Sequence, residues 1–91
     1  MSGGHFNGAQ YRVDELAREI EEMANDIDVQ RAKGFGDLDF SAETSEAFRD
    51  GARLLRMAYV YAQRIDYLVS GDDGESTFHQ RLKADLGRLV Q

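Results

Sequence analysis

Apolar residues recur at helical spacing in three separate stretches of the chain. In the first stretch, steps of three and four residues place a set of apolar side chains on one side of a helix. The set consists of Val13, Leu16, Ile20, Met23 and Ile27. The remaining positions are mostly acidic, and acidic residues near the start of a helix suit its positive end. The pattern predicts a helix over residues 12–27.

The second stretch is the longest. Ser41 is a good N-cap, the helical pattern continues from Ala42 to Ser70, and Gly71 follows as a natural C-cap. Two sets of apolar residues occupy adjoining sides of this helix. One set is Phe48, Leu55, Ala58, Ala62, Ile65 and Val69, and the other is Leu54, Met57, Tyr61 and Leu68. The pattern predicts a helix over residues 42–70, on which small residues such as Ala52 would admit a close neighbour.

The third stretch predicts a helix over residues 76–90, with apolar positions at Phe78, Leu82, Leu86, Leu89 and Val90. Residues 28–40 keep no period and contain two glycines, so they are predicted to form a loop. We expect the apolar side chains of this loop, those of Phe35, Leu38 and Phe40, to fold onto the helices. No stretch has the alternation of a strand. The prediction is a single all-α domain over residues 1–91, a three-helix bundle in which a long central helix lies between two shorter antiparallel helices.

The central helix carries more apolar surface than two short helices can cover. Surplus apolar surface of this kind commonly meets another subunit. We therefore expect a homo-oligomer whose interface includes Leu54, Met57, Tyr59, Tyr61 and Tyr67. The alternative is that the loop over residues 28–40 folds back over this surface.

Composition and charge exclude several classes of protein. The chain has 91 residues, no cysteine and a net charge of −6. The absence of cysteine excludes disulfides and thiolate metal sites, and the acidic balance argues against a general nucleic-acid binder. No apolar run is long enough to span a bilayer, and the first residues lack the features of a secretory signal. We expect a soluble, cytoplasmic protein with no membrane partner.

Two segments of unusual composition are predicted to meet at one end of the bundle. In an up-down-up arrangement, the residues before the first helix and the turn over residues 70–76 lie at the same end. The two histidines of the chain, His5 and His79, belong to these segments. The candidate binding surface consists of His5, Phe6, Arg64, Asp72, Asp73, Glu75 and His79. We expect this surface to contact a partner protein, with no catalytic residue and no cofactor.

Other chemistry at the same residues stays open. A divalent metal could lie between the two histidines and the carboxylates of Asp72, Asp73 or Glu75, although the spacing matches no compact metal motif. Glycine-flanked amides could hold a phosphate, with arginines nearby. In the structural alternative, these residues only cap helices and form turns. Our prediction for this end contains no bound metal.

An acidic side of the first helix suggests a further possibility. Glu19 and Glu22 have the Glu-x-x-Glu spacing with which all-α nucleotide pyrophosphohydrolases hold magnesium. The second helix offers Glu46 and Asp50, which are one residue too far apart for the matching half. A metal-dependent phosphohydrolase is therefore the third alternative, and a solvated acidic surface accounts for the same residues.

Two motifs resemble a known group of proteins. The first is the opening SGGHF, and the second is YAQRIDYLVSGDDGE, which begins at Tyr61, followed by FHQRL, which begins at Phe78. Together they resemble a family of short uncharacterised bacteriophage and prophage proteins. The resemblance implies an accessory protein that binds a host factor, for example to counter host defence. The alternative is a sponge that holds a nucleotide messenger between subunits through Arg64 and the tyrosines.

Overall fold

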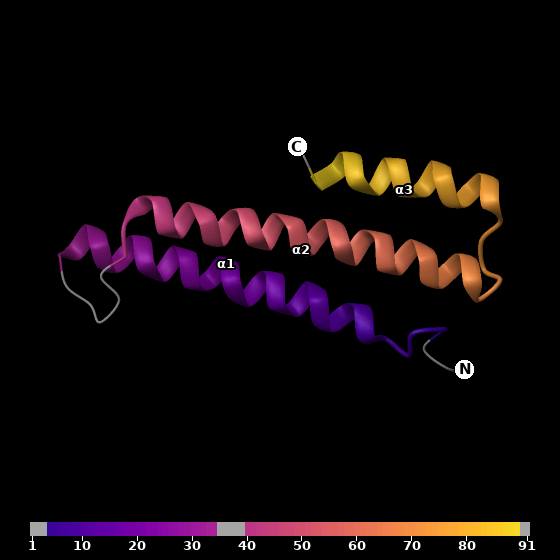
Figure 1. Cartoon of the computed structure of the whole chain (residues 1–91), viewed down its shortest axis with the longest axis horizontal. Coiled ribbons are helices and arrows are strands. Elements are labelled where there is room, and N and C mark those ends of the chain that lie inside the picture. The colour runs from indigo at the N-terminus through magenta and orange to yellow at the C-terminus, as the bar shows by residue number, and fades with distance from the viewer. Residues whose placement is uncertain (1–3, 35–39, 90–91) are drawn as a thin grey trace.

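The structure, a computed structural model, describes residues 4–34 and 40–89, and its regular elements there are all helices (Figure 1). The helices are α1 (Ala9–Lys33), α2 (Ala42–Val69) and α3 (Glu75–Leu89). They run up, down and up, and α2 lies between the other two. Within the described residues α1 and α3 do not touch each other. The predicted all-α class with a long central helix is confirmed.

Helix α1 is longer than predicted at both ends, and residues 28–33, predicted as loop, are helical. The apolar pattern stops at Ile27, but Asp28 accepts hydrogen bonds from Ser45 and Arg49 of α2. These polar contacts hold an extra turn of α1 against α2 although the turn lacks an apolar stripe. The helix ends at Gly34, which has a left-handed φ of 79° and donates to the carbonyls of Gln30 and Arg31. The expected positions of Phe35 and Leu38 lie outside the described residues, and Phe40 is exposed.

The other two helices start and end close to the predicted positions. Ser41 caps α2, because its side chain accepts from the backbone N–H of Thr44. Gly71 follows the last turn of α2 with a left-handed φ of 85°, as expected of a glycine at this point. Helix α3 begins one residue earlier than predicted, at Glu75, and contains no fully buried side chain. It is therefore held by one side of α2 alone.

The contact between α1 and α2 is made by small residues. Ala17 and Ala24 of α1 and Ala52 of α2 are completely buried. Side chains of this size allow two helix backbones to approach closely. Of the larger apolar residues in the predicted stripe, Ile27 is also completely buried, whereas Met23 and Leu16 lie at the margin of this contact. Met23 is 52 % exposed and Leu16 is 41 % exposed, because no third helix covers that side of α1.

Ion pairs follow one side of the α1–α2 contact. Both nitrogens of the Arg56 fork donate to the Glu21 carboxylate, at 2.7 and 3.1 Å. These hydrogen bonds outweigh partial burial and hold the pKa of Glu21 below its ordinary value. Hydrogen bonds from Ser45, Arg49 and Arg31, in that order, lower the pKa of Asp28 far more strongly. The side of the hairpin that carries these pairs is thus strongly polar.

These pKa shifts predict a loss of stability in acid. A carboxyl group whose pKa is lowered by folding stabilises the fold above its unfolded pKa, and this stabilisation is lost as the pH falls through the folded pKa. For Asp28 and Glu21 the loss begins below about pH 4 to 5. We expect the melting temperature, followed by circular dichroism, to fall steadily from about pH 5 towards about pH 2, the range over which ordinary and lowered carboxyl groups become protonated. A melting temperature that is constant or rises over this range would contradict the lowered pKa values of Asp28 and Glu21.

The three helices form a thin layer. The Cα atoms extend over 53 × 27 × 13 Å, with a radius of gyration of 16.9 Å. A compact domain of this length would have a radius of gyration of about 12 Å. A layer this thin has little interior, so many apolar side chains remain at its surface. In the described part of the chain, no helix combines the length and apolarity needed to cross a membrane.

Candidate functional site

The residues before α1 are attached to the last turns of α2. The backbone N–H groups of His5 and Phe6 donate to Oδ1 of Asp66, at 2.6 and 3.3 Å. The N–H of His5 also donates to Oγ of Ser70, at 3.0 Å. The predicted meeting of the N-terminal segment with this end of α2 is therefore confirmed. We call residues 4–8 the N-terminal turn.

Asp66 is the centre of this attachment. Asp66 is only 4 % exposed, and its Oδ2 also accepts a hydrogen bond from Nε2 of Gln10 at 3.0 Å. Burial alone would raise the pKa of the Asp66 carboxyl, but the hydrogen bonds from Gln10, His5, Phe6 and Ser70 together outweigh burial and lower it. Asp66 is thus an ionised, buried acceptor that holds two backbone donors of a distant segment.

The backbone of the N-terminal turn requires residues that accept a left-handed conformation. Gly4 has a φ of +88°, Asn7 of +54° and Gly8 of +79°. A Cβ atom on Gly4 would lie 2.6 Å from Oδ2 of Asp66, which is closer than such contacts allow. Asparagine is among the few other residues that adopt this region readily. The glycines of this segment are explained by shape, without invoking a bound phosphate.

The turn between α2 and α3 is built around a second buried carboxylate. The side chain of Asp73 is 1 % exposed and forms ion pairs with Arg81 at 2.9 Å and with Arg64 at 3.6 Å. Arg64 also approaches Asp85 at 3.5 Å, and its guanidinium lies over the ring of Tyr67. The charge of Arg64 is therefore matched within the chain. Arg64 and Asp73 hold the turn together, and neither is exposed for a partner.

Four of the five remaining predicted site residues are exposed, namely His5, Asp72, Glu75 and His79. The fifth, Phe6, is half-buried. The rings of His5 and Phe6 meet edge to face, and His79 meets Phe78 in the same way. Among residues 4–34 and 40–89, no three histidine, aspartate or glutamate side chains are grouped closely enough to hold a metal ion. That finding applies equally to the acidic side of α1.

The five residues predicted for an oligomer interface fall into two groups. Leu54, Met57 and Tyr61 are exposed, and Leu54 is the most exposed of the large apolar residues at 65 %. Tyr59 packs against Tyr11 with ring centroids 6.0 Å apart, and this burial raises the pKa of Tyr59. Tyr67 lies under Arg64 and accepts from Gln63. Tyr59 and Tyr67 therefore make contacts within the chain.

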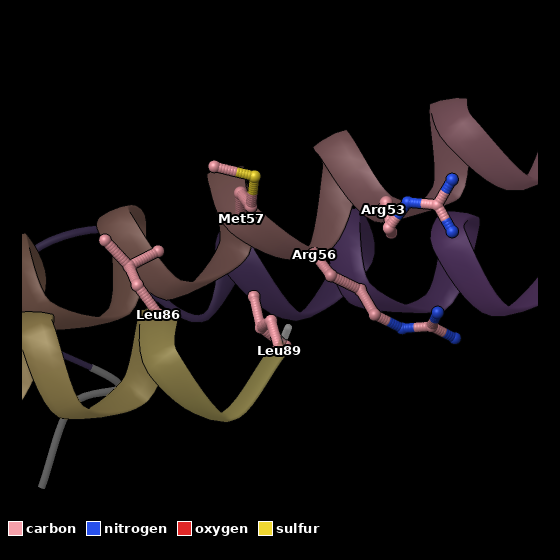
Figure 2. A pocket seen from close by; sticks show the side chains of 5 residues that line it. All are labelled: Arg53, Arg56, Met57, Leu86 and Leu89. Carbon is pink, nitrogen blue, oxygen red and sulfur yellow. The ribbon is translucent and has the colours of Figure 1, made fainter. Parts of the chain in front are cut away.

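A hollow between α2 and the end of α3 was not predicted from the sequence. It has a volume of about 210 Å³ and is lined by Met57, Leu86 and Leu89, with Arg53 and Arg56 at one side (Figure 2). Both guanidinium groups already pair with acids, Arg53 with Asp50 and Arg56 with Glu21. The hollow is apolar space left at the end of a loosely packed helix.

Sequence reasoning missed Asp66, Gln10 and Ser70, which hold the N-terminal turn. Asp66 and Ser70 lie near the end of α2 and Gln10 lies near the start of α1, and no spacing rule connects residues more than 50 positions apart. A comparison of the chain with models of known families, with curated proteins and with solved structures gave no match. The site is therefore assigned from its geometry and chemistry.

Proposed function

We propose that the chain is a phage- or prophage-type accessory protein that binds a host protein without catalysing a reaction. The proposed contact surface is the end of the layer where the N-terminal turn meets α2 and the α2–α3 turn. The observation that carries the proposal is the attachment of His5 and Phe6 to the buried carboxylate of Asp66. This attachment fixes a short segment that would otherwise be free to move.

A fixed segment favours binding because less conformational freedom is lost when a partner docks. Asp66 holds the backbone of the N-terminal turn, and the exposed imidazole of His5 lies edge to face against the ring of Phe6. Gly4, Asn7 and Gly8 readily hold the left-handed conformations of this turn, so the path of the segment is set by its own sequence as well as by Asp66.

The chemistry of the surface suits a protein partner. This end of the layer presents the exposed imidazole of His5, which meets the half-buried ring of Phe6, and the exposed carboxylates of Asp72 and Glu75. Aromatic and acidic groups at one end complement a partner that offers apolar side chains together with lysine or arginine. The two motifs of the phage-family resemblance supply these residues, which supports the same proposal.

The test compares host-protein binding by two double variants. His5→Ala with Asp72→Ala removes exposed groups from the proposed surface, and Lys33→Ala with Glu43→Ala removes exposed groups from the opposite end. A host protein retained by the natural chain would be purified, and its Kd for each variant measured by calorimetry. We expect the first variant to bind at least about tenfold more weakly, with an unchanged melting temperature, and the second to bind normally.

Equal affinity of the His5 and Asp72 variant would contradict the proposed surface. Failure of the natural chain to retain any host protein would contradict the proposed function. Asp73 is left unchanged in this test, because its buried ion pairs would make a loss of binding indistinguishable from a loss of folding.

A further inference from the structure

In the part of the chain that the structure describes, one side of the α1–α2 hairpin is apolar and no helix covers it. Helical spacing places six residues on this side, which we call the hairpin face: Leu16, Met23, Ala58, Ala62, Ile65 and Val69. Four of them are large apolar side chains between 37 % and 52 % exposed. The two helices contribute to one continuous surface, because Val13 of α1 and Ala62 of α2 line the same shallow hollow.

Helix α3 and the ion pairs that join α1 to α2 lie on other sides of the hairpin. The ion pairs of Glu21 with Arg56 and of Asp28 with Arg49 follow the opposite side of the α1–α2 contact. Helix α3 meets α2 near Met57 and Arg64, which also point away from Ala62 by the helical period. Within residues 4–34 and 40–89 no helix covers the hairpin face. On α1 it is bordered by Arg12, which pairs with Glu15 and Glu19.

The exposed area of the chain is large for its mass. The surface measures 6363 Å², whereas a compact monomer of 10.3 kDa exposes about 5400 Å². The difference of about 1000 Å² is close to the roughly 800 Å² that each partner buries in a stable interface. The surplus is thus of the size that one further copy of the chain would cover.

We propose that two copies of the chain pack hairpin face against hairpin face and form a four-helix core. A two-fold axis brings the same patch of both copies together, so an apolar surface meets an apolar surface. This interface differs from the one predicted around Leu54 and Tyr61, which lies on an adjoining side of α2. The inference is independent of the proposed host protein.

Sedimentation equilibrium of the natural chain and two matched variants tests this interface. Met23 and Val29 lie on α1 with similar exposure, 52 % and 49 %, but the helical period places them on different sides. We expect a mass of twice 10.3 kDa for the natural chain and for Val29→Glu, and a single-chain mass for Met23→Glu.

A single-chain mass for the natural sequence at every concentration would overturn the proposal, as would a dimer that persists in Met23→Glu. Circular dichroism verifies that the variants remain helical. If Met23→Glu loses helicity, the milder Met23→Ser decides, because it should raise the dimer Kd at least about tenfold without placing a charge in the core.

Discussion

Replacement of Ala24 by leucine is expected to destabilise the chain by about 2 to 3 kcal/mol, which is a large part of the stability of so small a domain. Ala24 is completely buried in the contact between α1 and α2. A leucine there has to push the two helices apart, and this would also separate the neighbouring alanines. Urea unfolding followed by circular dichroism measures the change in the free energy of unfolding.

The matched control is Ala32→Leu, at an exposed position of the same helix. The same increase in side-chain size should change the stability there by less than about 0.5 kcal/mol. If the two variants unfold at the same urea concentration, α1 and α2 do not meet through Ala24, and the arrangement of the layer would be wrong.

Removal of the Asp66 carboxylate is expected to have the second large effect. Asp66→Ala removes the acceptor that the buried amide of Gln10 shares with the N–H groups of His5 and Phe6. Loss of this buried acceptor should lower the melting temperature by roughly 10 °C for a chain of this size. Differential scanning calorimetry gives the shift directly.

Asp72→Ala is the control, because Asp72 is exposed near the same end and should melt as the natural chain does. Gly4→Ala supplies an independent check, since its Cβ would collide with the Asp66 carboxylate and release the N-terminal turn. An Asp66→Ala chain that melts at the natural temperature would show that the turn is not held by this residue.

The number, order and class of the helices could be predicted from the sequence because apolar spacing reports helices directly. The end of α1 could not, because Asp28 extends the helix through hydrogen bonds to Ser45 and Arg49 rather than through apolar packing. Apolar periodicity also identifies the apolar side of a helix but does not show which element packs against that side. It therefore could not show that Met23 stays half exposed while Ala17 and Ala24 make the contact.

The sequence could predict where the candidate site lies in the fold, but not which side chains hold it together. The up-down-up order was enough to bring His5 near the end of α2, and the structure confirms this meeting through Ser70. Asp66 could not be identified, because an aspartate within a long helix usually faces solvent. Asp73 was predicted to be part of an exposed binding surface, because an aspartate in a turn usually is exposed. In the structure its side chain is enclosed by Arg64 and Arg81.

Amide hydrogen exchange at His5 and Phe6 tests the central claim, a terminal segment fixed by Asp66, most directly. Resonance-resolved exchange would be recorded for the natural chain and for Asp66→Ala. We expect both amides to be protected in the natural chain, because each donates to a buried carboxylate, and to lose that protection in the variant. Exchange in the natural chain as fast as in an unstructured peptide would contradict the attachment and, with it, the proposed binding surface.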